Sequence, residues 1–197
     1  MMRSSNLSLG LIAIVIIATT MMIMAPLAVS ATHLWTGHKW VRPNNTIYFC
    51  IHSSFSTTYK NAIMKAANDV TALPSSISLP SKNYDSKCTN HVYPSDLNPN
   101  YIAYAFVNYY SSGNIKSADV AVSTQYQFNA VGCTDSYPPP MNLVYTMHHE
   151  FSHWIEMKHP SVNGEYTVMN SYYKCNLWNN WGGHDTSTIL SVYPPPQ

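Results

Sequence analysis

From residue 46 onward, the spacing of apolar positions predicts short strands and two helices. Apolar and polar residues alternate over 46–51, which is typical of a strand in a sheet. Over 57–71 apolar residues recur at the spacing of one helix face, and the proline at position 74 follows them. Residues 101–110 are rich in aromatic and β-branched side chains and are expected to form a strand, as are residues 118–123.

Turn-forming residues separate these segments. Residues 80–100 are rich in them, residues 111–114 read Ser-Ser-Gly-Asn, and residues 125–137 are expected to form a loop. A second helix is expected to follow Pro140 and to run to about Glu156. The order of strand, helix, strands, helix and irregular chain predicts an α+β domain with helices packed on a sheet.

The first 31 residues have the features of a targeting segment. Arg3 precedes an almost wholly apolar run over 9–24, and small residues follow at 28–31. This predicts a signal peptide that is cut after Ala31, followed by a single domain over 32–197 that is secreted or held at the cell surface. The alternative is an uncleaved membrane anchor, because the apolar run approaches the length that spans a bilayer.

The charge balance excludes an electrostatic nucleic-acid binder. The 197 residues include 10 Lys and Arg against 9 Asp and Glu, a formal net charge of +1. Such a chain has no basic surface for a phosphate backbone, so no nucleic-acid partner is expected.

Four cysteines follow the expected leader. An even number in an exported chain predicts two disulfides, for which three pairings are possible. Cys50–Cys88 and Cys133–Cys175 are favoured because they close the shorter loops. The wide spacing, with no C-x-x-C pair, argues against a structural zinc ribbon.

The second expected helix contains the pattern H-E-x-x-H. His149 and His153 are four residues apart, so on a helix they lie within about 40° of each other on one face. Two imidazoles in this arrangement can bind one metal ion. Glu150 projects beside the first histidine, where it can reach a metal-bound water without being a ligand.

A third histidine follows at the end of this segment. On a continuing helix His159 would point roughly 100° away from the face shared by His149 and His153, so the chain must leave the helix near Glu156 and double back. Pro160 favours this, because a proline disfavours helical geometry in the residue before it. Three neutral histidines leave a fourth tetrahedral position for water, as a catalytic zinc requires.

With His159 the chain resembles the metzincin metallopeptidases, whose pattern H-E-x-x-H-x-x-G-x-x-H is followed by a Met-turn. The segment His-Glu-Phe-Ser-His is similar to the matrixin segment His-Glu-Phe-Gly-His. Residues 118–122, Ala-Asp-Val-Ala-Val, resemble the Ala-Asp-Ile stretch of that branch. The spacing of the matrixin C-terminal helix is matched by Asp185, Ile189, Val192 and Tyr193.

The resemblance implies a zincin-like α+β fold of the metzincin type. Such a fold has a twisted mixed sheet with an edge strand over the cleft, an active-site helix, and a loop-rich C-terminal subdomain with a Met-turn. The edge strand that would pair with an extended substrate is expected to comprise Ala118, Asp119, Val120, Ala121 and Val122. The Met-turn candidate is 167–170, with Met169 as the packing floor of the metal site.

The resemblance also implies the function of an exported, monomeric, zinc-dependent endopeptidase acting on a peptide or protein substrate. One Zn²⁺ would be held by His149, His153 and His159, and would activate a water molecule and polarise the scissile carbonyl. Glu150 would take the proton of that water and later deliver it to the leaving amine.

One residue departs from the family pattern. The family glycine at the helix exit is Glu156 here, and a residue other than glycine costs about 1 kcal/mol or more at positive φ. If the helix instead continued to Glu156, its carboxylate would fall on the face of His149 and His153, so Glu156 is an alternative third ligand.

Two further function classes remain open. One is a catalytically inactive zincin-fold module that binds zinc or peptide at the cell surface, and the other is a metal-free structural domain. Peptidase activity on an unstructured protein separates the enzyme from the binding module, and metal content separates both from the structural domain.

Overall fold

The computed structural model describes residues 35–41, 45–82, 88–130, 132, 140–160, 167–171 and 181–196. The expected leader and both cysteines of the expected Cys133–Cys175 pair lie outside these ranges. Within them, no helix combines the length and the apolar character needed to cross a membrane.

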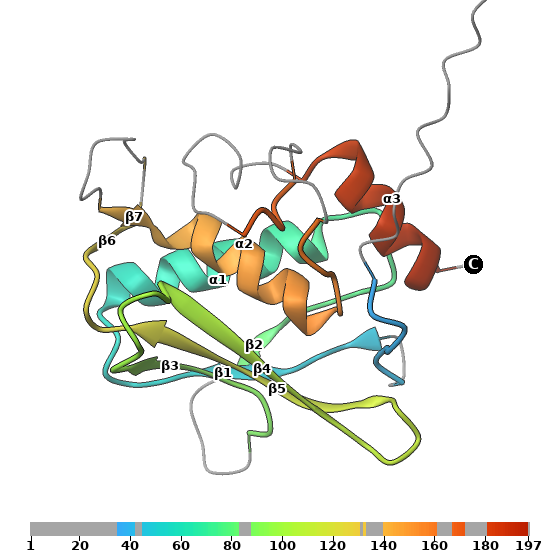
Figure 1. The fold of residues 1–197 in the computed structure, drawn as a ribbon, viewed down its shortest axis with the longest axis horizontal. Helices are drawn as coiled ribbons and strands as arrows, with labels where there is room; N and C mark the ends of the chain where they lie inside the picture. The colour runs from blue at the N-terminus through green and yellow to red at the C-terminus, as the bar shows by residue number, and fades with distance from the viewer. Residues whose placement is uncertain are drawn as a thin grey trace, which may run out of the picture. The chain divides into compact units, whose positions relative to one another are not determined.

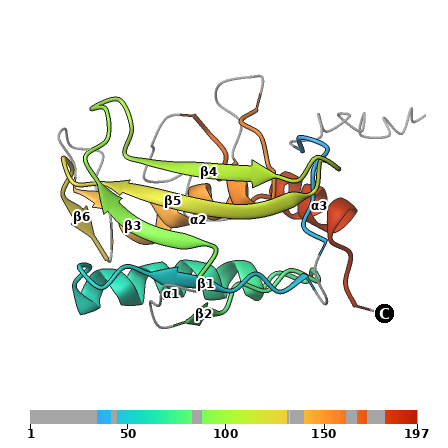
Figure 2. The same cartoon turned by 90° about the horizontal axis from the view of Figure 1, so that it is seen from below.

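The described part of the domain is built on a five-stranded sheet with the order β2-β1-β3-β5-β4 (Figures 1 and 2). Its strands are β1 (Phe49–Ile51), β2 (Ser81–Lys82), β3 (His91–Ser95), β4 (Ala103–Tyr109) and β5 (Ile115–Ser123). The first four in spatial order run parallel, and β4 runs antiparallel to β5. With the helices that pack on this sheet, the prediction of an α+β class with a mixed sheet is confirmed.

The expected position of the edge strand was wrong. Ala118, Asp119, Val120, Ala121 and Val122 all belong to β5, which pairs with β3 on one side and with β4 on the other. The edge position is taken by β4, because the turn around Gly113 (φ +83°) folds the chain back into a hairpin. Alternation of apolar residues identifies a strand but carries no information on its neighbours, so the residues alone did not reveal the order.

Two helices pack side by side on one face of this sheet (Figures 1 and 2). They are α1 (Thr57–Thr71) and α2 (Leu143–Trp154), and a third helix, α3 (Gly183–Val192), lies in the C-terminal part. Two short strands, β6 (Phe128–Asn129) and β7 (Met141–Asn142), pair with each other, and β7 leads directly into α2. Asn142 then caps α2 by accepting a hydrogen bond from the Tyr145 N–H. The helix therefore begins three residues after Pro140 and ends two residues before Glu156.

An aromatic cluster fixes α2 against the sheet. The ring of Phe49 on β1 lies 5.4 Å from that of Phe151 and 5.8 Å from that of Trp154, both in edge-on geometry. All three side chains are fully buried, and each contributes about 1.5–3 kcal/mol relative to an exposed position. At the end of α2 the Trp40 indole donates a hydrogen bond of 2.7 Å to the main-chain oxygen of Trp154. The histidines of α2 thus lie on a helix that cannot shift without opening the core.

One of the two expected disulfides is present in the described residues. Cys50 on β1 is bonded to Cys88, which precedes β3, with 6.1 Å between their Cα atoms. This pairing, favoured above because it closes the shorter loop, is confirmed.

Candidate metal centre

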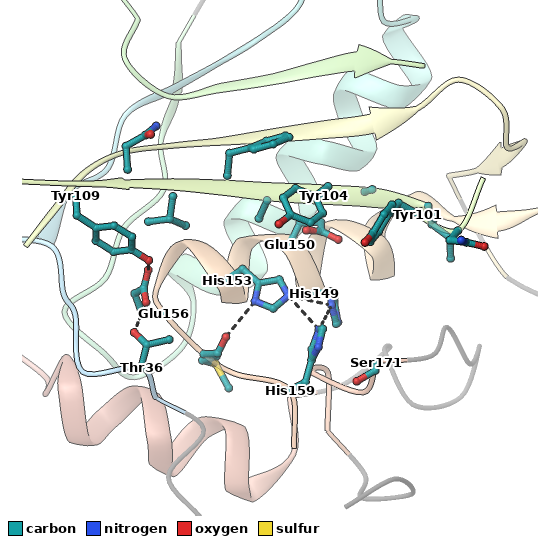
Figure 3. A pocket seen from close by; sticks show the side chains of 18 residues that line it. Thr36, Tyr101, Tyr104, Tyr109, His149, Glu150, His153, Glu156, His159 and Ser171 are labelled. Atoms are coloured by element: carbon teal, nitrogen blue, oxygen red, sulfur yellow. Dashed lines mark hydrogen bonds between the residues drawn. The ribbon is translucent and has the colours of Figure 1, made fainter. Parts of the chain in front are cut away.

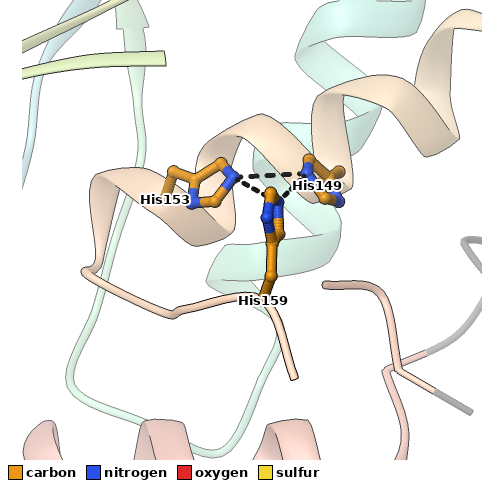
Figure 4. Close-up of side chains that lie close together, drawn as sticks. All are labelled: His149, His153 and His159. Atoms are coloured by element: carbon orange, nitrogen blue, oxygen red, sulfur yellow. Dashed lines mark hydrogen bonds between the residues drawn. The ribbon is translucent and has the colours of Figure 1, made fainter. Parts of the chain in front are cut away.

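Three histidine side chains converge in the described part of the chain (Figure 4). His149 and His153 come from α2, and His159 comes from the segment that follows it. The three Nε2 atoms form a triangle with sides of 3.1, 3.2 and 3.2 Å. The structure thus brings the three predicted metal-binding residues together at one point.

Main-chain carbonyl groups orient two of these rings. The Nδ1 of His149 lies 2.7 Å from the oxygen of Val168, and the Nδ1 of His153 lies 3.1 Å from the oxygen of Met157. A carbonyl oxygen can only accept, so each Nδ1 carries the proton and each Nε2 presents a lone pair. Lone pairs so close together repel one another unless a cation lies between them.

The dimensions of the triangle match a single small cation. With metal–nitrogen distances of about 2.0–2.1 Å, tetrahedral ligand atoms lie about 3.3–3.4 Å apart, close to the observed separations. Partners that hold the second ring nitrogen of a ligand histidine, as Val168 and Met157 do here, are a regular feature of metal sites. The three residues therefore fit a metal ion.

The electrostatics of the cluster favour neutral rings. Burial and the neighbouring imidazoles lower the pKa of His149 well below 6.5, and the same causes lower the pKa of His153 to about 4. Burial also lowers the pKa of His159. At neutral pH all three rings are therefore in the unprotonated state that binds metals.

Glu150 lies next to this cluster on α2 and faces the edge strand (Figure 3). Burial raises the pKa of its carboxyl to about 8, and a hydrogen bond from the main chain of Ala105 on β4 acts in the opposite direction. Its Oε2 is buried and has no hydrogen-bond partner within the described residues. A buried carboxylate oxygen of this kind needs a proton or a cation close by, which is the second feature that fits a metal site.

The expected Met-turn is an ordered turn that supports His149. The N–H of Asn170 bonds to the oxygen of Thr167, and Val168 and Met169 are buried between them. The carboxylate of Asp185 on α3 holds the turn, because it accepts hydrogen bonds from the hydroxyl of Thr167 and from the N–H of Val168 at 3.1 Å.

The role of Asp185 was missed by sequence reasoning, which placed this residue only in the spacing of a helix. Asp185 also accepts a hydrogen bond of 2.9 Å from the N–H of Gly182. An acidic residue in the first turn of a helix is the one signal that points to such a role, but it does not reveal the partners in the distant turn.

Glu156 is not a ligand of this cluster. The helix ends at Trp154, and Glu156 adopts a left-handed conformation with φ +68°. Its carboxylate accepts hydrogen bonds from the hydroxyl groups of Tyr109, at 2.6 Å, and of Thr36 (Figure 3). The alternative in which Glu156 is the third ligand is therefore wrong, because the helical phase on which it rested ends two residues earlier.

A cleft of about 610 Å³ separates β4 from the histidine cluster (Figure 3). Its wall on the sheet side is β4, which pairs with β5 alone among the described strands. The N–H of Ala105 bonds to Glu150. Ala118 on β5 is the partner of Val107, and its N–H bonds to the side chain of Asn90 and not to β4. Val107 and Ala118 therefore form a pair without main-chain hydrogen bonds between them. Ala105 and Val107 therefore occupy positions whose main-chain groups point to the open edge of β4.

Comparison with known proteins does not assign the chain to a family. No family model matches the chain, and a search of curated proteins found no significant match.

Proposed function

We propose that the protein is an exported zinc-dependent endopeptidase of the metzincin type. The observation that supports this most is the convergence of three neutral imidazoles beside a buried carboxylate on the same helix, next to an open strand edge. The disulfide between Cys50 and Cys88 supports export to the cell surface or the medium, because disulfides persist in oxidising environments.

Zinc is the metal we infer for this centre. Imidazole nitrogens suit zinc, and three of them leave one position open for water and substrate. When bound, the ion would supply a lowered pKa for that water and polarisation of the scissile carbonyl.

Glu150 is assigned the role of general base and then general acid. Its Oε2 is free to take a proton from the attacking water, while Ala105 holds the carboxylate in place. The raised pKa belongs to the metal-free site. A cation bound beside Glu150 would lower it, so that the ionised carboxylate could accept the proton of the water and then pass it to the leaving amine.

The open edge of β4 is the proposed binding surface for the substrate main chain. An extended peptide can add to this edge by β-augmentation, which brings its carbonyl groups toward the histidine cluster. The strand has the sequence Ala-Tyr-Ala-Phe-Val-Asn-Tyr, without a charged side chain, so we expect uncharged substrate segments to be preferred.

The direct test is cleavage of casein by residues 32–197, with and without a chelator. Glu150→Gln should abolish turnover and retain zinc, whereas His159→Ala should lose both. Turnover by the Glu150→Gln variant at the wild-type rate would contradict the mechanism. Zinc binding without cleavage of any unstructured protein would instead favour the binding module.

A further inference from the structure

Glu156 occupies a backbone conformation that suits glycine. Its φ of +68° places Cβ against the neighbouring carbonyl, and only glycine adopts this region without strain. The residue is nonetheless buried, with a relative exposure of 2%. A strained, buried carboxylate persists only where its surroundings hold it firmly.

The carboxylate is held by two segments that are remote in sequence. The hydroxyl of Tyr109, at the end of β4, donates to Oε1 at 2.6 Å, and the hydroxyl of Thr36 donates to Oε2. The main-chain oxygen of Glu156 also accepts the N–H of Thr36 at 3.0 Å. Burial and this hydrogen bond raise the pKa of Tyr109 above its usual value, so the phenol stays protonated as a donor.

Both partners are themselves fixed. The ring of Tyr109 lies 4.6 Å from the ring of His38, whose Nδ1 lies 2.7 Å from the oxygen of Gly113 in the hairpin turn. Trp35, next to Thr36, forms an isolated antiparallel β-bridge with Met157. Glu156 therefore connects the segment around Thr36, the end of the edge strand β4 and the chain that leaves α2.

The position of this junction matters for the metal centre. The N–H of Glu156 bonds to the oxygen of His153 at 2.9 Å, and the next residue, Met157, supplies the oxygen that faces the Nδ1 of His153. Three residues after Glu156 the chain reaches His159. The turn at Glu156 thus sets both the orientation of one histidine and the direction from which another arrives.

We propose that Glu156, Tyr109 and Thr36 form an exit latch that positions His153 and His159 for metal binding and couples them to the edge strand. The proposal rests on the proposed function only in assuming that the three histidines bind a metal. A glycine at position 156 would make the same turn without strain, so the turn does not require the carboxylate, whereas the contacts to Tyr109 and Thr36 do. We assign the three latch residues a positioning role, because their polar groups bond to one another and none of them belongs to the histidine cluster.

The test compares Glu156→Gly, Glu156→Gln and Tyr109→Phe with the control Tyr110→Phe, which removes the hydroxyl of a neighbouring exposed tyrosine. Zn²⁺ affinity is measured by competition with a chelator, and the visible spectrum of bound Co²⁺ reports the ligand geometry. Circular dichroism of the metal-free forms establishes folding.

We expect Tyr109→Phe and Glu156→Gly to weaken Zn²⁺ binding by about 10-fold or more, as for other residues that orient metal ligands, and to change the Co²⁺ spectrum. Glu156→Gln keeps one acceptor and should retain more affinity than Glu156→Gly. The control should bind both metals like the wild type.

Wild-type affinity and spectrum in Glu156→Gly or Tyr109→Phe would overturn the latch. If Glu156→Gly does not fold, Tyr109→Phe decides the question alone. A wild-type chain that binds neither metal would contradict the latch and the zinc site together. A chain that binds zinc without cleaving protein contradicts only the proposed enzyme, and the latch is still judged by the affinities.

Discussion

The Nδ1 of His149 donates a hydrogen bond of 2.7 Å to the main-chain oxygen of Val168, nineteen residues further along the chain. This contact couples His149 to the buried turn at 167–170. The carboxylate of Asp185 holds that turn by accepting hydrogen bonds from Thr167 and Val168. A carboxylate on α3 therefore orients a ring on α2 without touching it.

Replacement of Asp185 by asparagine should destabilise the protein and weaken metal binding. The carboxylate accepts three hydrogen bonds in a buried place, and an amide would turn its NH₂ group toward one of these donors. We expect a loss of about 2–4 kcal/mol in the free energy of unfolding, measured in urea. Asp96→Asn, at an exposed position, is the matched control and should change it by less than about 0.5 kcal/mol. Equal stability of the two variants would contradict this role for Asp185.

Between pH 4.5 and about 8, the stability of the metal-free protein should depend on the protonation of Glu150. Its pKa is raised from 4.5 to about 8, so between these values the folded state holds a proton that the unfolded state has released. Stability must then fall as the pH rises through this window, by at most about 1.4 kcal/mol per pH unit. Urea unfolding at pH 6.5 and 8.0 in the presence of a chelator should show this loss in the wild type. The loss should be smaller in Glu150→Gln, and parallel curves would refute the raised pKa.

The buried histidines should act in the opposite direction at lower pH. The pKa of His153 falls from 6.5 to about 4, so in this window the unfolded state binds a proton that the folded state does not. Stability must fall as the pH decreases from 6.5 toward 4. The Glu150→Gln background removes the opposing carboxyl. In that background, the metal-free His153→Gln variant should lose less stability between pH 6.5 and 5 than its parent, by up to about 1–2 kcal/mol. An identical decline in both proteins would show that His153 titrates normally.

Local features of the site could be predicted from the sequence, and long-range ones could not. The pairing of His149 with His153 follows from helical periodicity, which is a property of neighbouring residues. The neighbours of β5 and the partners of Glu156 depend instead on contacts between distant segments. Tyr109 and Thr36 lie 47 and 120 residues from Glu156, and no periodic pattern connects them. The departure from glycine at position 156 was visible in the sequence, but its compensation became visible only in three dimensions.

The reassignment of the open edge from β5 to β4 can be tested with proline, which removes one main-chain N–H. At Ala105 and Val107 the N–H points away from β5, so proline should leave the pairing of the two strands in place. Val107→Pro should raise KM for a peptide with little change in kcat, because it removes a contact to the substrate main chain alone. Ala105→Pro should lower kcat as well, since the N–H of Ala105 holds Glu150. Tyr110→Phe, at an exposed position that does not line the cleft, is the control and should leave both constants within about 2-fold of the wild type. Unchanged KM in Val107→Pro, in a folded protein, would mean that the substrate does not add to this edge.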